Sequence, residues 1–297
     1  MPELPDITLY VEALATRVQG HTLKRVAVGS PFLLRSAEPS LAETFGQRVT
    51  TSKRLGKRIA LGLENGLWLV IHLMIAGRLH WFASGRRRSG RRALAFFEFD
   101  NGTLTLTEAG TQRRASLYVV RGKEGLRAHQ RRGLEILETP LQEFAQRLQI
   151  ENHTLKRALT DPQLFSGIGN AYSDEILHAS RLSPVALTQR LSGDEIERLY
   201  AASVRVLQDW TERLRSEAHG EFPEGVTAFR EDFAVHGRFR KRCPVCQTEI
   251  QRIRYASNET NYCPRCQTGG RILADRSLSR LLKDDWPRSI EELESRN

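Results

Sequence analysis

The sequence has no long hydrophobic run and very little cysteine. Its longest apolar stretch, residues 67–76, is interrupted by His72 and is too short to span a bilayer. The N-terminus lacks the basic region and apolar run that mark a secretory signal. Only four cysteines occur among the 297 residues, and all of them lie near the C-terminus. These absences argue against a membrane protein and a secreted one, and they predict a soluble cytoplasmic chain with no membrane partner.

Acidic residues are outnumbered by basic ones, which indicates a polyanionic partner. The chain carries 45 Lys and Arg against 35 Asp and Glu, a formal net charge of +10, and its pI is near 9.8. Basic surfaces attract nucleic acid and release counterions from its phosphates. With 40% hydrophobic residues, the chain can bury cores for two domains or more. We therefore expect a globular nucleic-acid-binding protein, although charge alone does not distinguish DNA from RNA.

The cysteines form two Cys-x-x-Cys pairs, Cys243 with Cys246 and Cys263 with Cys266. Each pair can direct two thiolates at one ion, and the segment 247–262 is long enough for a β-hairpin that brings the pairs together. Two disulfides or a redox pair are competing interpretations, but a cytoplasmic setting disfavours stable disulfides. The spacing predicts one structural Zn²⁺, because four thiolates leave no open position for water. Basic residues around the predicted finger are expected to bind phosphates of a nucleic acid: Arg238, Arg240, Lys241, Arg242, Arg252, Arg254 and Arg265.

The first part of the chain changes from helical to strand periodicity. Apolar residues at helical spacing predict an amphipathic helix that ends at Gly20: Ile7, Tyr10, Val11, Leu14 and Val18. Alternating apolar residues then flank Asn65-Gly66 and Asn101-Gly102, and Asn-Gly between such runs is typical of a tight hairpin. Residues from about Thr22 to Val120 are therefore expected to form an antiparallel β-sandwich or barrel. Arginines at 86–88 and 91–92 lie among Ser and Gly and are interpreted as a solvated loop.

From about Arg131 the pattern becomes helical, which predicts a second domain. Ser192-Gly-Asp-Glu195 is typical of a capping box that opens a helix with an apolar stripe. At the centre of this domain, the glycine turn in Gly167-Ile-Gly-Asn170 feeds a helix start. Free backbone N–H groups and the Asn170 amide would face outward there, and this arrangement suits a phosphate. A Gly-x-Gly turn alone, however, is usually only a tight bend.

The N-terminus offers a nucleophile, because removal of Met1 would leave the secondary amine of Pro2 next to the Glu3 carboxylate. A terminal amine has an ordinary pKa well below that of lysine, so part of it is neutral near pH 7. A secondary amine condenses with an aldehyde to give an iminium ion. Taken alone, a Pro-Glu terminus is more simply explained as a stiff entry to the first helix.

Together, these motifs resemble those of the formamidopyrimidine-DNA glycosylase and endonuclease VIII family, over residues 2–266. Pro2-Glu-Leu-Pro-Asp6 is similar to the family's N-terminal Pro-Glu-Leu-Pro-Glu, and residues 167–175 resemble its helix–two-turn–helix signature. The four-cysteine hairpin resembles its zinc finger. The resemblance implies an α+β multidomain fold with these parts: an N-terminal antiparallel β-sandwich with a flanking helix (1–130), a helical helix–two-turn–helix domain (131–232), a zinc-finger hairpin (233–270) and a C-terminal tail (271–297).

The resemblance also implies an activity. Members of this family are bifunctional DNA glycosylases and abasic-site lyases of base excision repair, and the chain would act as a monomer on damaged duplex DNA. Pro2 would form a Schiff base with the sugar of an oxidised nucleotide, Glu3 would act as acid and base, and β,δ-elimination would follow. Lys57 matches a lysine that contacts the phosphate and assists catalysis. Asn170 and Lys156 match phosphate contacts near the lesion. From the residues alone, Lys57 is an ordinary strand-edge charge and Lys156 is a surface helix residue.

Some positions expected to touch DNA depart from the family pattern. In residues 72–78, Ile75 stands at the position of the residue that wedges into DNA, and Met74 stands where glycine is usual. An apolar wedge is therefore retained, and both Ile75 and Met74 are candidates for the DNA-binding side chain that inserts. Arg113 matches the residue that fills the gap left by the flipped base. Ala115 replaces the aromatic residue that stacks on the opposite strand. These changes leave the nucleophile in place but affect lesion recognition.

Further departures keep a second function open. Asn258 stands where an arginine usually clamps the phosphates beside the lesion, and Asp6 replaces a glutamate. The alternative to an active enzyme is a DNA-damage-binding protein of the same fold with weak or no glycosylase activity. A zinc-ribbon RNA-binding protein would explain the charge and the cysteines, but it gives no reason for the Pro-Glu terminus.

The tail beyond the last cysteine pair is expected to form a stabilising cap on the finger. Four leucines could build a short helix there: Leu273, Leu278, Leu281 and Leu282. Asp284-Asp285-Trp286-Pro287 is interpreted as the end of that helix.

Overall fold

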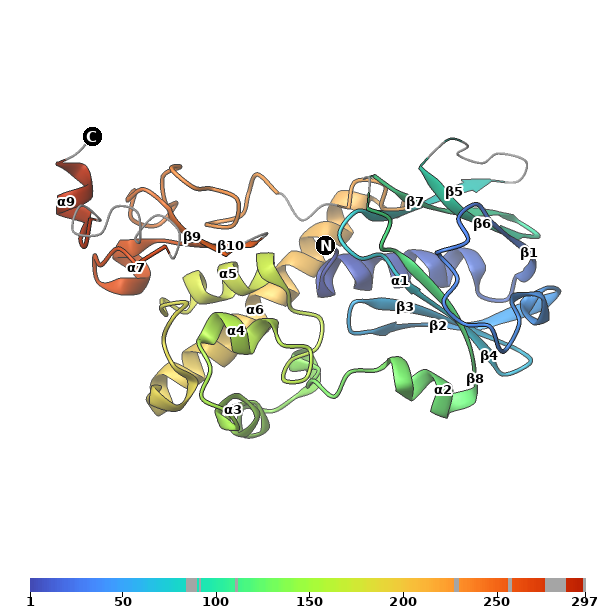
Figure 1. The fold of residues 1–297 in the computed structure, drawn as a ribbon, viewed down its shortest axis with the longest axis horizontal. Helices are drawn as coiled ribbons and strands as arrows, with labels where there is room; N and C mark the ends of the chain where they lie inside the picture. The colour runs from blue at the N-terminus through green and yellow to red at the C-terminus, as the bar shows by residue number, and fades with distance from the viewer. Residues whose placement is uncertain are drawn as a thin grey trace. The chain divides into compact units, whose positions relative to one another are not determined.

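The computed structural model forms two compact units (Figure 1). The N-terminal unit comprises residues 1–131 and 210–228, and the C-terminal unit comprises residues 132–209 and 229–297. The structure describes residues 1–83, 90, 92–109, 112–226, 230–255, 258–275 and 287–295. Several predicted features lie outside these residues: the arginines at 86–88 and 91, the tail leucines Leu278, Leu281 and Leu282, and the helix stop at 284–286.

An eight-stranded sheet dominates the N-terminal unit, and its neighbouring strands pair antiparallel in the order β5-β7-β6-β1-β2-β3-β4-β8. The predicted hairpins are confirmed, because Asn65-Gly66 joins β3 to β4 and Asn101-Gly102 joins β6 to β7. The bounds of the strands are β1 (Thr22–Val28), β2 (Gln47–Leu55), β3 (Arg58–Leu63), β4 (Leu67–His72), β5 (Gly77–Ala83), β6 (Ala93–Phe99), β7 (Gly102–Glu108) and β8 (Ser116–Arg121). The short helices η1 (Leu41–Thr44) and α2 (Gly122–His129) lie in the connections.

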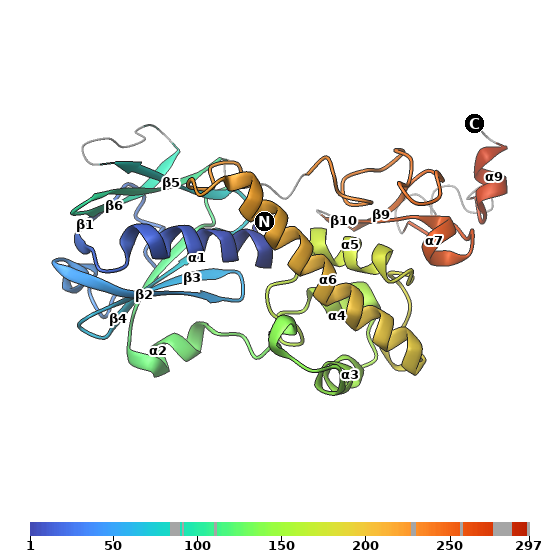
Figure 2. The same cartoon turned by 180° about the vertical axis from the view of Figure 1, so that it is seen from behind.

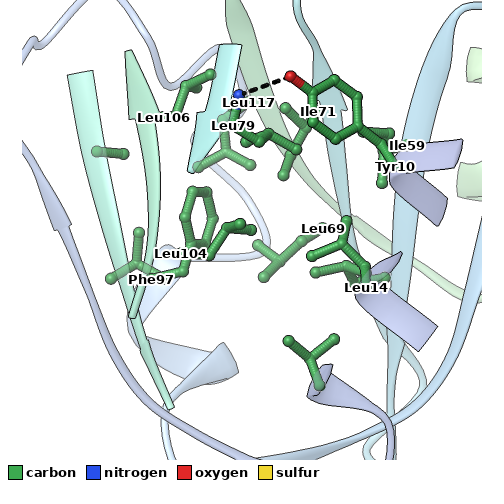
Figure 3. Packing of buried hydrophobic residues seen from close by; sticks show 14 of the residues in the cluster. Tyr10, Leu14, Ile59, Leu69, Ile71, Leu79, Phe97, Leu104, Leu106 and Leu117 are labelled. Atoms are coloured by element: carbon green, nitrogen blue, oxygen red, sulfur yellow. Dashed lines mark hydrogen bonds between the residues drawn. The ribbon is translucent and has the colours of Figure 1, made fainter. Parts of the chain in front are cut away.

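This sheet folds into two layers around one core. β1 and β2 share only two residue pairs, Thr22 with Arg48 and Leu23 with Gln47, after which β1 pairs along β6. The half that contains β6 and β7 and the half that contains β3, β4 and β8 therefore face each other (Figure 3). Buried residues from both halves meet between them: Ile59, Leu69, Ile71, Leu117, Phe97, Leu104 and Leu106. The predicted β-sandwich is thus confirmed.

Helix α1 (Leu4–Val18) packs one face into the same core. Four of its residues are fully buried at helical spacing: Ile7, Tyr10, Leu14 and Val18. The Tyr10 hydroxyl accepts a hydrogen bond from the Leu79 N–H at 3.3 Å, and burial raises the pKa of this phenol (Figure 3). The chain leaves the helix through Gly20, whose φ of 81° favours glycine. Because α1 is held by the core, it fixes the position of the N-terminus.

The C-terminal unit consists of helices followed by a small hairpin. Its elements are η2 (Ile136–Glu138), α3 (Leu141–Gln149), α4 (Leu155–Thr160), α5 (Asn170–Ala179), η3 (Thr188–Arg190), α6 (Gly193–Ala218), β9 (Gln251–Tyr255), β10 (Asn258–Tyr262), α7 (Pro264–Thr268) and α9 (Ile290–Glu294). The predicted capping box opens α6, shown in gold in Figure 2: Ser192 N donates to Glu195 Oε2 at 2.9 Å, and Glu195 N donates to Ser192 Oγ at 3.2 Å. The last residues of α6, from 210 onward, belong to the N-terminal unit. Among the described residues, no helix has the length and hydrophobicity that a bilayer crossing requires.

Two buried carboxylates of α5 hold the segments of the finger. Glu175 accepts hydrogen bonds from the backbone N–H groups of residues 234–236 at 2.7–2.9 Å. Asp174 Oδ2 accepts from the backbone N–H of Asn261 at 3.1 Å and lies 2.7 Å from His236 Nδ1. Buried charges need such partners, because an unsatisfied carboxylate in the interior is costly. Hydrogen bonds to these two carboxylates therefore connect the finger to α5.

The described end of the chain returns to the finger. Ile272 N donates to Arg288 O, and Ile290 N donates to Gly270 O, both at 3.0 Å. Ile290 is buried, with 3% of its surface exposed. The short helix α9, which begins after the predicted end of the tail helix, is thus tied to the segment that follows the last cysteine pair. The cap function of the tail stays a prediction.

Candidate functional site

The N-terminus enters α1 through a capping box between Glu3 and Asp6. The Glu3 N–H donates to Asp6 Oδ2 at 2.9 Å, and the Glu3 carboxylate accepts from the Asp6 N–H. Both side chains are buried, with 2% and 1% of their surface exposed, and Pro2 is buried beside them. Pro5 suits the first turn because its fixed φ matches a helix start. The capping box that stiffens the helix entry therefore also holds the Glu3 carboxylate next to Pro2.

The surroundings of the chain terminus favour a neutral amine. Burial holds the pKa of the Met1 amine below its ordinary value of 8.0, although the Glu3 carboxylate acts in the opposite direction. Arg78 and Lys57 lower this pKa further. Lys57 belongs to the turn between β2 and β3 and is partly buried. The structure thus brings Lys57 into the electrostatic surroundings of Glu3 and the chain terminus.

Basic side chains that the sequence analysis did not include lie around His72 together with Lys57. Burial lowers the pKa of His72 to about 4, and Arg58, Lys57 and Arg131 reinforce the shift, so this imidazole is neutral at pH 7. Arg58 faces His72 across the β3–β4 pair, and its Nη1 donates to the His129 carbonyl at 2.8 Å. Counting outward from a two-residue Asn65-Gly66 turn pairs Arg58 with Leu73, one residue away from the observed partner His72, so the sequence alone did not predict this pair. Local sequence likewise gives no signal for Arg78 or Arg131.

A tight turn between β4 and β5 carries the predicted wedge. Gly77 N donates to Leu73 O at 2.9 Å, and the Ile75 side chain in this turn is 60% exposed. Met74 has a φ of 52°, in the left-handed region that favours glycine. This left-handed backbone conformation at Met74 gives a physical reason why glycine is usual at this position in the family. Insertion of Ile75 into DNA stays a prediction.

Gly77→Ala is expected to destabilise the protein by about 1–3 kcal/mol, because the turn leaves no room for a Cβ atom. A Cβ at residue 77 would lie 2.2 Å from Leu73 O and 2.9 Å from Leu73 C, both backbone atoms. Gly193→Ala is the matched control, since nothing lies within 4 Å of its Cβ position. Chemical denaturation measures the free energy of unfolding of both variants. Equal values would show that the turn opens easily.

Glu108 shapes the loop that carries Arg113. Its buried carboxylate accepts hydrogen bonds from the Arg114 N–H at 3.0 and 3.1 Å and from the Ala115 N–H at 3.1 Å. Ala115 is buried, with 3% of its surface exposed, whereas the Arg113 side chain is exposed. Sequence reasoning missed Glu108, because its partners follow it through a loop of no regular spacing. Filling of the gap in DNA by Arg113 stays a prediction.

At the predicted phosphate turn, Asn170 and Lys156 both make internal hydrogen bonds. The helix start is present, and Asn170 Nδ2 donates to Glu259 O at 2.9 Å. Lys156 Nζ donates to three oxygens: Asn170 O at 2.7 Å, Ser173 Oγ at 2.8 Å and Asp174 Oδ1 at 2.5 Å. These bonds use the three donors of the ammonium group. Lys156 therefore supports the turn in this structure, and phosphate contacts by Asn170 and Lys156 stay predictions.

The four cysteines converge on one point, because the β9–β10 hairpin brings the two pairs together. Their sulfur atoms all lie within 4.8 Å of one another. The distances between sulfur atoms are 3.9 Å for Cys243–Cys266, 3.4 Å for Cys246–Cys263 and 3.5 Å for Cys246–Cys266. A tetrahedral zinc with Zn–S bonds of about 2.3 Å requires sulfur separations of about 3.8 Å. The cluster fits one structural Zn²⁺, and His178 Nε2, 3.3 Å from Cys243 Sγ, can support that thiolate.

Three family models match successive parts of the chain. They are the formamidopyrimidine-DNA glycosylase N-terminal domain over residues 1–116, the formamidopyrimidine-DNA glycosylase H2TH domain over residues 135–218, and the zinc finger found in FPG and IleRS over residues 240–269. The third match covers all four cysteines. Together with their geometry, it assigns one structural zinc to the finger.

Relatives and solved structures agree with these matches. The formamidopyrimidine-DNA glycosylase of Pelotomaculum thermopropionicum is 31% identical over 275 residues, which cover 90% of this chain and 99% of the relative. That of Heliobacterium modesticaldum is 32% identical over 279 residues, with 90% and 100% covered. The crystal structure of the MutM (FPG) protein from Thermus thermophilus has a TM-score of 0.76 and 30% identity, with 90% and 98% covered. A Lactococcus lactis FPG (MutM) complex with FAPY-dG-containing DNA has a TM-score of 0.79 at 22% identity, with 90% and 100% covered, and it supports the fold.

Proposed function

The chain belongs to the formamidopyrimidine-DNA glycosylase family, and on this premise we propose that it is a bifunctional DNA glycosylase and abasic-site lyase of base excision repair. Its substrate is damaged duplex DNA, which the net charge of +10 favours. The observation that carries the proposal is the burial of Pro2 and Glu3 side by side at the start of α1. Burial at this place also lowers the pKa of the Met1 amine, which is the chain terminus in this structure. A repair enzyme of this bacterial type acts on the chromosome in the cytoplasm, and we infer that it does so as a monomer.

Pro2 is the nucleophile once Met1 has been removed. The damaged base is first rotated out of the stack, at a cost of a few kcal/mol that lesions reduce. The lone pair of the Pro2 nitrogen forms a bond with C1′ of the sugar while the bond between C1′ and the base breaks. The base leaves with those electrons and takes up a proton. Glu3 protonates the ring oxygen O4′ as the sugar opens, and the product is an iminium ion between Pro2 N and C1′.

The iminium ion then drives cleavage of the strand. It withdraws electrons from C2′, so a base can remove a C2′ proton and the 3′ phosphate is expelled. A second elimination expels the 5′ phosphate, and water releases the sugar fragment from Pro2. In this sequence Glu3 moves the protons and Lys57 holds a phosphate of the strand.

In this proposal, the C-terminal unit binds the phosphate backbone of the DNA. We infer that Asn170 contacts a phosphate at the start of α5, where backbone N–H groups and the helix dipole favour an anion. Lys156 then contributes by holding the Asn170 carbonyl and Asp174, as its three hydrogen bonds indicate. Basic residues of the finger extend this surface.

A damage-binding protein with weak glycosylase activity is the second candidate. The observation in its favour is that Ala115 and Asn258 stand where the family has an aromatic residue and an arginine that contact DNA. It keeps the same partner and the same fold, so only a chemical assay separates the two functions.

Borohydride trapping on duplex DNA with one abasic site is expected to yield a covalent adduct on Pro2. The reductant converts the iminium ion into a stable amine, and mass spectrometry of the linked peptide identifies the residue. The protein is produced with a cleavable N-terminal extension, and protease treatment releases a chain that begins at Pro2.

The uncleaved protein is the matched control, because its Pro2 nitrogen is part of an amide and cannot attack. An adduct that forms only after cleavage supports the enzyme. If the cleaved chain binds abasic DNA tightly but gives no adduct, the lyase proposal fails and the damage-binding function takes its place.

A further inference from the structure

Phe32 is a large aromatic residue whose side chain is exposed to solvent. It is 71% exposed, the largest value among the large hydrophobic residues that the structure describes as exposed. Pro31 beside it is also exposed, whereas Ser30 and Leu33 at the two ends of this segment are 4% and 1% exposed. Single exposed apolar side chains are common on protein surfaces, so the case for a binding role of Phe32 depends on its surroundings.

A short turn presents this ring in a fixed place. Leu33 N donates to Ser30 O at 3.0 Å, which closes a four-residue turn with Pro31 and Phe32 at its centre. On both sides of Phe32, the turn is tied to strands of the sheet: Gly29 N donates to Leu94 O at 2.8 Å, and Leu117 N donates to Leu33 O at 2.8 Å. The backbone around Phe32 is therefore ordered before any partner binds, so a contact made by the ring requires no ordering of the chain itself.

The ring borders an open hollow with basic walls. The hollow measures about 480 Å³ and is lined by Gly29, Ser30, Pro31, Phe32, Arg35 and Arg113. Its two charged lining residues are both arginines, and both are exposed. An aromatic face beside guanidinium groups is the combination that binds bases and phosphates of a nucleic-acid strand. Charge complementarity thus indicates a strand of DNA as the occupant.

The hollow lies beside the loop in which an aromatic residue is missing. Ala115 follows Arg113 by two residues, but its methyl group is buried and Glu108 holds its backbone N–H. An aromatic contact with DNA on this face must therefore come from another segment. Phe32 is the aromatic residue that lines the hollow with Arg113.

We propose that Phe32 stacks on a nucleobase of the bound DNA beside Arg113, as a recognition residue supplied by the turn between β1 and η1. The inference rests on the proposed function, because it needs damaged DNA as the partner. It assigns to residues 29–35 a contact with an unstacked base, while Arg35 and Arg113 hold the adjoining backbone. Phe32 takes no part in the chemistry at Pro2.

The test compares Phe32→Ala, Phe32→Trp and wild type in binding to a duplex that carries one stable abasic-site analogue. Stacking on an aromatic residue contributes enough that Phe32→Ala is expected to weaken binding roughly 5- to 150-fold. Phe32→Trp is expected to retain affinity, and its additional tryptophan fluorescence is expected to be quenched when the damaged duplex binds. Ile150→Ala is the matched control, because Ile150 is 61% exposed and does not line the hollow.

The outcomes separate this inference from the proposed function. Unchanged affinity of Phe32→Ala, or added fluorescence in Phe32→Trp that damaged DNA does not alter, would overturn the stacking contact even if wild type forms the Pro2 adduct. Loss of affinity with quenched tryptophan fluorescence supports the contact, and it does so whether or not borohydride trapping succeeds. Equal weakening by Ile150→Ala would show that the effect is unspecific and would also overturn it.

Discussion

Glu3→Gln is expected to lower the rate of base excision by roughly 10²–10⁴-fold, the usual contribution of a general acid or base. The amide cannot protonate the sugar oxygen, but its carbonyl can still accept the hydrogen bond from the Asp6 N–H, so the start of α1 survives. Trapping on a pre-formed abasic site should fall much less, because that sugar already equilibrates with its open-chain aldehyde. Single-turnover kinetics on a duplex with one oxidised base and on an abasic duplex measure the two effects separately.

Glu12→Gln is the control for the loss of a carboxylate from the same helix. Glu12 is 42% exposed and pairs with Arg215 at 2.8 Å, so its replacement should leave both rates unchanged. Equal loss of excision and trapping in Glu3→Gln would contradict the assigned role. It would indicate that Glu3 mainly positions Pro2 through the capping box.

Removal of zinc is expected to unfold the finger and to abolish tight DNA binding. The buried core of the finger around the site is small and includes two of the ligands: Val235, Cys243, Ile250 and Cys263. So few apolar contacts cannot offset the entropy of ordering the segment, whereas a structural zinc contributes about 10–16 kcal/mol of binding free energy in finger peptides. Cys263→Ala and chelator-treated wild type should both lose the metal. Zinc content, hydrogen exchange of residues 240–269 and DNA affinity are the measurements.

The N-terminal unit should remain folded after zinc is lost, because its core shares no residue with the core around the metal. Val245→Ala is the control variant, since this side chain is 61% exposed between two ligand cysteines. It should keep one zinc per chain and full DNA affinity. Protected amide hydrogens in the finger of the metal-free protein would contradict the prediction.

Local signals predicted the elements of the fold well. Asn65-Gly66 and Asn101-Gly102 mark hairpins because only a few turns match the twist of paired strands, and both turns occur where expected. The cysteine spacing predicted the metal cluster for a similar reason: two Cys-x-x-Cys turns have one common way to share an ion. In both cases the physical determinant lies within a few residues of the chain.

Side-chain partners that follow no helix or hairpin spacing could not be predicted in this way. Nothing near Lys156 in the sequence indicates that Asp174 and Ser173 take up its donors, and nothing near Glu108 indicates that it fixes Arg114. The same limit applies to Phe32, since its exposure depends on how the segment 30–33 lies beside β8. Family resemblance gave Lys156 a role as a phosphate contact, but the packing uses the donors of its ammonium group in internal hydrogen bonds.

The carboxylate of Asp174 has a consequence for exchanging parts between relatives. One oxygen binds Lys156 beside the start of α5, and the other accepts a hydrogen bond from the Asn261 N–H of the hairpin and lies beside His236. A chimera that imports a foreign zinc hairpin would break half of this arrangement and leave a buried charge without its partner. The transferable module is therefore α4, α5 and the finger together, and substitutions at residues 156, 174, 236 and 261 should be tolerated only as a set.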